Sequence, residues 1–262
     1  MRSIRGFVLF GLIILFQTAC FEIEQALDLN RDLSGEAEFS IGIDFEPMVL
    51  IMLQMQREME GKEGPPSAEE IAAARQEFLE DPTRTEQEEI LPVAEREEME
   101  SSFPAGVRLL DARVRQSEMK VATSFRFSFD HISKLSQIEL PEKADASPES
   151  KTLIKQPFAG LEFEEEGDVL SIRSQPADPT AAVEEETADA PAEGMEELGE
   201  MMKKAFEGMR VVYRIRTPFE PSEHNATRRE GDLLIWEYDF AALEKLGKEQ
   251  ASDLGVSARY RR

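Results

Sequence analysis

Residues 21–45 read FEIEQALDLNRDLSGEAEFSIGIDF, and this stretch decides the fold of the chain. Apolar residues recur at nearly every second position on both sides of a turn cluster that runs from Asn30 to Gly35. An alternation of period two is typical of strands that bury one face and expose the other. The stretch therefore predicts an antiparallel hairpin.

The pattern changes from strand to helix after this hairpin. Pro47 stands where a helix can begin, and residues 48–59 are apolar at helical spacing. Residues 67–70 form a capping box that opens a second helix, and residues 85–101 predict a third, acidic one. We expect residues 46–102 to form a helical insert that packs on the sheet.

Strand patterns return in the second half of the chain. Two further hairpins are expected, and each turns through the tripeptide Glu-Gly-Asp, which suits a tight turn. The expected strands lie at residues 107–114, 119–129, 161–163, 169–172, 211–215, 225–229 and 233–238, and short helices at 130–138 and 240–246. Strands with segregated helices predict an α+β fold with a mainly antiparallel sheet, in one domain over residues 20–247.

The chain is strongly acidic, with a formal net charge of −24. This charge argues against nucleic acid as a partner, because phosphates would be repelled. Residues 176–200 contain nine Asp or Glu and no Lys or Arg, and they offer too little apolar surface to offset the entropy of ordering. We expect a disordered acidic loop at residues 176–194 and a mobile tail at residues 248–262.

The beginning of the chain predicts an export signal. Arg2 and Arg5 precede an apolar run over residues 7–16, and a small residue, Ala19, comes shortly after it. Such a segment is typical of a signal peptide, and its apolar run is shorter than the roughly 20 residues of a spanning helix. Residues 1–19 are therefore expected to be a cleaved signal peptide.

Cys20, the only cysteine of the chain, follows this segment directly. The segment resembles the signal of bacterial lipoproteins, in which the cysteine at this position receives acyl chains. The resemblance implies a membrane anchor through lipid on Cys20; the alternative is an ordinary secreted protein with an unpaired cysteine. An aspartate after the cysteine retains enterobacterial lipoproteins at the inner membrane, so Phe21 implies the outer membrane and a domain that faces the periplasm.

The sequence lacks the usual motifs of catalysis. It has no Gly-x-Ser-x-Gly elbow, no phosphate-binding loop, no His-Glu-x-x-His motif and no dinucleotide fingerprint. His131 and His224 are the only histidines, and we expect both to be exposed and structural. The sequence therefore predicts no enzyme, no catalytic residue, no metal site and no cofactor.

Four methionines form a single stripe on the helix expected after the first hairpin: Met48, Met52, Met55 and Met59. Their flexible side chains suit an irregular core, which is the favoured interpretation. The stripe could instead line a groove for lipid or a partner, or bind Cu(I), for which thioethers are suitable ligands. Trp236 lies in an alternating strand and is expected in the core, with a role facing an apolar ligand as the alternative.

The two ends of the chain resemble a known family. The hairpin at 21–45, Thr217-Pro218-Phe219, Asn225-Ala226 and the strand ending at Trp236 look like the LppM-type domain of bacterial lipoproteins. The resemblance implies an exported α+β domain, with lipid or envelope association in some relatives and no enzymatic activity. It supplies no site residues, and the helical insert and the acidic loop have no counterpart in it.

The sequence thus favours a lipid-anchored protein of the bacterial envelope with a non-enzymatic binding role. Its partner is expected to be an envelope protein or an apolar ligand. The alternative is a lipid carrier with an internal cavity, and an envelope enzyme comes third. A cavity near residues 48–59 would indicate a carrier, whereas a filled core and an exposed apolar patch would indicate an interaction protein.

Overall fold

The hairpin at residues 21–45 forms as predicted in the computed structural model of the chain. Strand β1 (Phe21–Leu29) pairs with β2 (Gly35–Asp44) in register from Phe21↔Ile43 to Leu29↔Gly35. The structure describes residues 21–62, 64–80, 87–90, 93–140, 156–158, 160–174, 208–249 and 255–262. Gly35 is required at the turn, because a Cβ there would overlap the carbonyl oxygen of Asp28.

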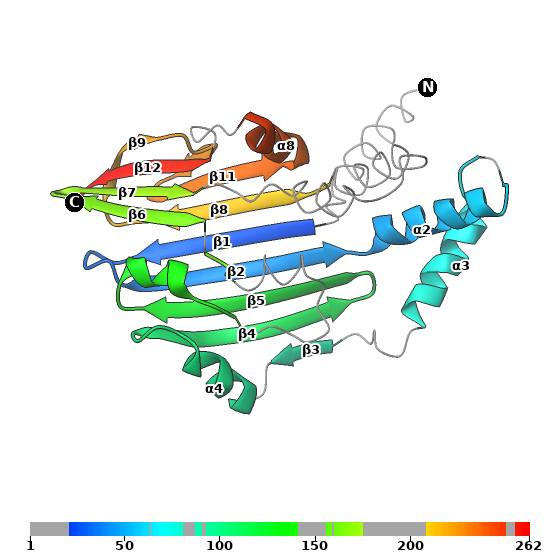
Figure 1. Ribbon diagram of the computed structural model, residues 1–262, viewed down its shortest axis with the longest axis horizontal. Coiled ribbons are helices and arrows are strands. Elements are labelled where there is room, and N and C mark those ends of the chain that lie inside the picture. Colours follow the sequence, from blue (N-terminus) through cyan, green and yellow to red (C-terminus); the bar gives the residue numbers. More distant parts are fainter. Residues whose placement is uncertain are drawn as a thin grey trace, which may run out of the picture.

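This hairpin lies in the middle of an eight-stranded sheet with the strand order β10-β11-β8-β1-β2-β5-β4-β3 (Figure 1). Its other strands are β3 (Gln87–Ile90), β4 (Val107–Ser117), β5 (Lys120–Phe129), β8 (Arg210–Arg216), β10 (Arg228–Glu230) and β11 (Leu233–Asp239). Neighbours in this sheet pair antiparallel, except that β1 and β8 run parallel from Glu22↔Arg210 to Asp28↔Arg216. The predicted α+β fold, mainly of antiparallel strands, is confirmed at this level.

A second, four-stranded sheet has the order β6-β7-β12-β9. Its strands are β6 (Leu161–Glu166), β7 (Val169–Ser174), β9 (Glu220–His224) and β12 (Val256–Arg261). The mobile tail predicted for residues 248–262 is therefore wrong for its last part, because β12 pairs with β7 on one side and β9 on the other. The buried residues of β12 are Val256, Ala258 and Tyr260, which alternate with polar ones. The period-two pattern of a strand is therefore present in the sequence, but it covers only 6 residues.

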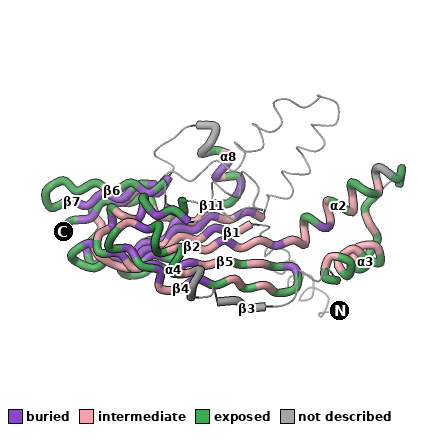
Figure 2. Tube along the Cα trace, turned by 60° about the horizontal axis from the view of Figure 1, so that its bottom comes forward, coloured by how far each residue is buried: buried purple, intermediate pink, exposed green. Residues whose placement is uncertain are grey.

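The core lies between the two sheets and is rich in aromatic rings. Phe158 packs edge-on against Phe39 and Phe127 of the large sheet, with ring centroids 6.3 and 5.9 Å apart. The 3-10 helix η1 (Ile132–Gln137) adds two fully buried side chains, Ile132 and Leu135. Figure 2 shows the buried residues concentrated in the strands and largely missing from the helices beyond them.

The helical insert differs from its prediction in two ways. Helices α2 (Glu46–Met59) and α3 (Ala68–Leu79) extend past the end of the sheet and pack on each other, not on the sheet face (Figure 1). Residues 87–90 form the edge strand β3 against β4, so the third helix, α4, covers only Val93–Ser101. Pairing with β4 gives the backbone N–H and C=O groups of these four residues hydrogen-bond partners. A helix here would have almost no apolar face to bury.

The closing helix α8 (Phe240–Glu249) forms where the sequence predicts one. The signal peptide predicted at residues 1–19 and the acidic loop predicted at 176–194 lie outside the described residues. Among the helices that the structure does describe, none is long and apolar enough to span a bilayer.

Candidate functional site

The outer face of the eight-stranded sheet, which points away from the core, carries rows of charged side chains. Along β1 these are Glu22, Glu24 and Asp28, which alternate with the buried Ile23 and Leu27. Strand β8 presents three arginines on the same face: Arg210, Arg214 and Arg216. Because β1 and β8 are parallel neighbours, an acidic row lies beside a basic row, and we call the two rows the charge ladder.

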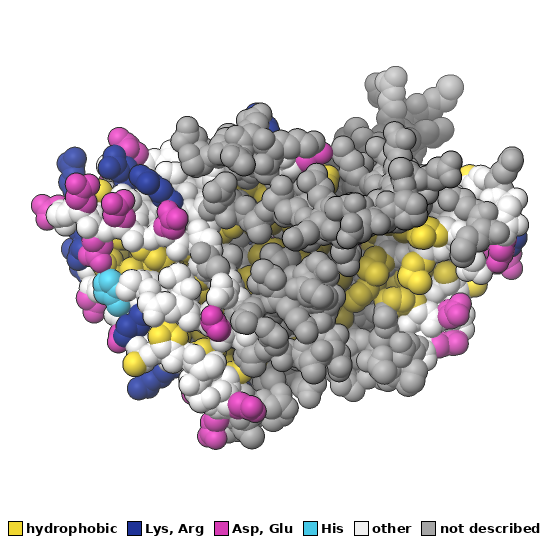
Figure 3. Space-filling model, in the orientation of Figure 1, with side chains coloured by type: hydrophobic (Ala, Val, Ile, Leu, Met, Phe, Trp, Pro, Cys, Tyr) yellow, Lys and Arg dark blue, Asp and Glu magenta, His cyan; other side chains and the backbone are white. Residues whose placement is uncertain are grey.

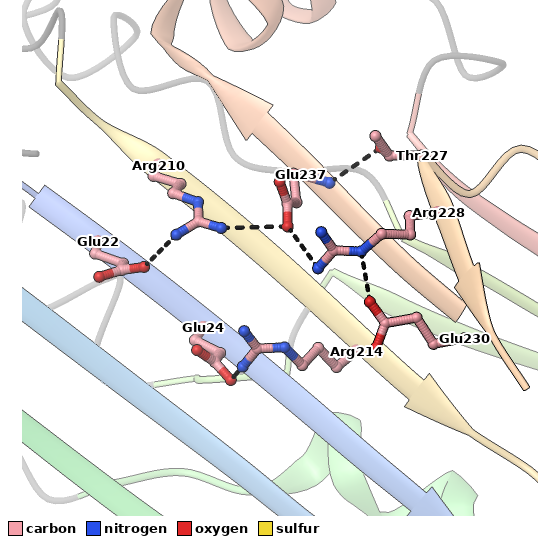
Figure 4. A network of polar contacts seen from close by, with 8 residues as sticks. All are labelled: Glu22, Glu24, Arg210, Arg214, Thr227, Arg228, Glu230 and Glu237. Atoms are coloured by element: carbon pink, nitrogen blue, oxygen red, sulfur yellow. Dashed lines mark hydrogen bonds and ion pairs between the residues drawn. The ribbon is translucent and has the colours of Figure 1, made fainter. Parts of the chain in front are cut away.

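Each acid of the ladder pairs with an arginine across the two strands, and Figure 4 draws the pairs of Glu22 and Glu24. Arg210 lies 3.2 Å from Glu22 and Arg216 lies 3.1 Å from Asp28, measured between guanidinium nitrogen and carboxylate oxygen. Arg214 contacts Glu24 between them. Exposed ion pairs of this kind contribute about 0–1 kcal/mol each to the free energy of folding. The main effect of the ladder is therefore to hold the charged side chains in defined positions on the sheet surface.

The ladder continues onto the next two strands through Glu237 of β11. Its carboxylate oxygen Oε1 forms ion pairs with Arg210 of β8 and Arg228 of β10, and it lies 3.2 Å from a guanidinium nitrogen of each. Arg228 also lies 2.9 Å from Glu230 of its own strand. One connected network therefore runs across β1, β8, β11 and β10 through Glu22, Arg210, Glu237, Arg228 and Glu230, while Glu24 and Arg214 form a separate pair (Figure 4).

Two shallow hollows lie on this outer face, and Glu38 and Arg126 border both. The first, of about 250 Å³, has further charged walls from Asp28, Glu36, Arg214 and Arg216. The second, of about 380 Å³, is lined by Ser40, Asp111, Arg113, Arg115, Ala122 and Ser124. Walls with charges of both signs suit a polar protein or peptide surface, because an acyl chain would remove water from these charged groups and offer them no hydrogen bonds in return.

The methionine stripe is exposed, so the interpretation of it as core is wrong. The exposed fractions are 47% for Met48, 63% for Met52 and 38% for Met55, while the side chain of Met59 lies outside the described set. The physical reason is the position of α2, which projects from the sheet and, among the described helices, packs mainly on α3. The groove and Cu(I) interpretations of the stripe stay predictions.

Trp236, in contrast, lies in the core as predicted and not on a ligand-facing surface. It is 1% exposed, and its ring nitrogen Nε1 donates a 2.7 Å hydrogen bond to Oδ1 of Asn225. The same oxygen accepts a bond from the backbone N–H of Ser257, and the Asn225 amide nitrogen donates to the carbonyl of Gly255. Asn225 therefore joins β11 of the large sheet to β12 of the small one.

The two histidines show no catalytic arrangement. His131 caps η1 through its ring Nδ1, and its Nε2 lies 3.4 Å from Glu165 of β6. His224 is exposed at the end of β9. Within the described ranges, no group of three or more His, Cys, Asp or Glu residues is placed to hold a metal ion.

The charge ladder is the part of this site that sequence reasoning missed. The alternating arginines of residues 210–216 were a visible signal of a strand with a basic outer face. Their acidic partners lie 188 residues away, and the sequence pattern does not reveal that β8 pairs with β1. Only the strand order brings the two rows together.

Comparison with known proteins gives a likeness to solved structures but no match in sequence families. No protein-family model matches the chain, and no curated protein matches it. Among solved structures, the chain is similar to the folded domain of LppM from Mycobacterium tuberculosis, at 11% identity over 94% of this chain and 92% of that one. The TM-score is 0.42. LppM is also the protein after which the domain type that the sequence resembles is named. A TM-score this low says nothing about the function of this chain.

Proposed function

We propose that this chain is a lipid-anchored, non-enzymatic protein of the bacterial envelope that binds another envelope protein through the outer face of its large sheet. The observation that carries the proposal is the charge ladder beside two hollows of mixed charge. Ordered charges of both signs favour one partner and one orientation over others, because a misplaced partner meets like charges. Glu38 and Arg126, between the hollows, are exposed to such a partner.

The anchor in this proposal is lipid on Cys20, the residue that directly precedes β1. The sequence signal supports it, and Phe21 after the cysteine supports the outer membrane with the domain facing the periplasm. Because no residue separates Cys20 from the strand, the folded domain would stay within about one residue length, roughly 4 Å, of its acylated residue.

A protein partner is favoured over the alternative of a lipid carried in an internal cavity. Both hollows lie on the charged outer face, while Phe127 and Phe158 fill the space between the sheets.

The proposal is tested by crosslinking in intact cells. A photo-crosslinking residue in place of Ser124, in the second hollow, should give one discrete adduct with an envelope protein. Arg126→Glu should reduce that adduct about tenfold, since it reverses a charge between the hollows and leaves the fold intact. Arg31→Glu, an equal charge change on an exposed turn, is the matched control and should leave the adduct unchanged.

Two results would overturn the binding face. One is an adduct from Ser124 that survives Arg126→Glu at full yield. The other is an equal adduct from Ser136, which is exposed on η1 and lies off the outer face.

A further inference from the structure

The side chains of α2 that are exposed within its described part, residues 46–57, are all uncharged. From residue 46 to 57 they are Met48, Met52, Met55 and Gln56. The charged groups of this stretch pair with α3 instead: Glu46 contacts Arg75, and Arg57 lies 2.5 Å from Glu70. In a chain with a net charge of −24, this helix presents a neutral face led by three methionines.

The stripe lies at the end of the sheet where β1 begins. Phe21, the residue after Cys20, is paired with Ile43, and α2 starts only three residues after Ile43 (Figure 1). Helix α2 is about 21 Å long, so all three methionines lie within roughly 30 Å of the acylated residue. Figure 3 shows hydrophobic side chains gathered at this end of the molecule, beside α2 and α3.

We infer that Met48, Met52 and Met55 insert into the surface of the same bilayer that holds the lipid on Cys20. The inference rests on the lipid anchor of the proposed function. The occupant of this face is a neutral phospholipid surface: it is kept within reach by the anchor, and the absence of charge on the face avoids repulsion from lipid phosphates. An interfacial helix lies along the bilayer and buries its apolar face about 5–10 Å deep.

The lipid-bound position of the helix is measured with a polarity-sensitive fluorophore. The lipidated chain is placed on phosphatidylcholine vesicles, with Met52→Cys as the labelled position, since the native cysteine is blocked by its lipid. We expect blue-shifted emission and strong quenching by nitroxide-labelled lipids. Ser136→Cys, exposed on η1, is the matched control and should report water.

A charge placed on the stripe gives the second variant. Because Met52 is 63% exposed, Met52→Glu should stay folded with a melting midpoint within a few degrees of the parent. It should remove most of the lipid quenching from a fluorophore at Met55→Cys. Ser136→Glu adds the same charge far from the stripe and should leave that quenching unchanged.

The outcomes separate the anchor from the stripe. A chain that does not float with the vesicles refutes the anchor, and with it this inference. A chain that floats while the label at position 52 reports water keeps the anchor and refutes the stripe. Blue-shifted emission without quenching by nitroxide lipids would mean that a protein surface, such as a second copy, covers α2, and this also refutes bilayer contact.

Discussion

Replacing Asn225 by alanine should lower the free energy of unfolding by about 2–4 kcal/mol. The substitution leaves the Nε1–H of Trp236 buried without an acceptor, which costs about 1–3 kcal/mol by itself. It also removes the bonds to Ser257 and Gly255 that join the two sheets. Urea unfolding monitored by far-UV circular dichroism measures the change, and this readout also works in variants that lack Trp236, the only tryptophan of the chain.

Two further variants show whether the loss comes from the buried bond. Thr227→Ala removes one side-chain bond in the same loop, to the backbone N–H of Glu237, and should cost less than about 1.5 kcal/mol. In a Trp236→Phe background, Asn225→Ala should cost clearly less than in the parent, because no ring N–H is left unpaired. Equal costs in both backgrounds would contradict the role given to Asn225.

Replacing Tyr260 of β12 by alanine should have a still larger effect, about 3–5 kcal/mol. The ring is 1% exposed in the middle strand pair of the small sheet, so its removal leaves a large cavity. Tyr260→Phe is the matched control. Within the described part of the chain, the buried Tyr260 hydroxyl has no hydrogen-bond partner, so its removal should leave stability unchanged or raise it by about 1 kcal/mol. A costly Tyr260→Phe would show that the hydroxyl has a partner.

The same tyrosine gives the protein a pH dependence on the alkaline side. Burial raises the pKa of the Tyr260 phenol above its ordinary value of 10.0. A raised folded-state pKa means that the unfolded chain releases this proton first, so the contribution to stability is complete below pH 10 and falls as the pH rises further. The fall should be smaller in Tyr260→Phe, as measured by melting midpoints between pH 9 and pH 11.

The parts of the fold that depend on local pattern could be predicted from sequence. The alternation in residues 21–45 predicts the first hairpin with nearly correct ends, and Ser67 caps α3 as its capping box indicates. The parts that depend on distant neighbours could not. Whether the α2 methionines are buried depends on where the helix leaves the sheet, and apolar spacing is the same in both cases.

The charge ladder shows the same limit for the candidate site. Its arginines and acids are each visible as an outer row of a strand, yet their pairing depends on a parallel contact that spans most of the chain. The sequence singles out Asn225 and Trp236 as two separate positions that resemble the LppM-type domain, with no sign that they contact each other. Their hydrogen bond became clear only from the structure.

The parallel pairing of β1 with β8 also sets when the sheet can close. Glu22 and Arg210 are 188 residues apart, so β8, β11 and β10 can join the rest of the large sheet only after most of the chain is available. Pairings between such distant segments carry a large loop-closure entropy and slow the folding reaction. A chain that is threaded through a translocation channel has to remain unfolded until it emerges. If this chain is exported as proposed, the contact between its first and last thirds would provide that delay through the topology of the sheet.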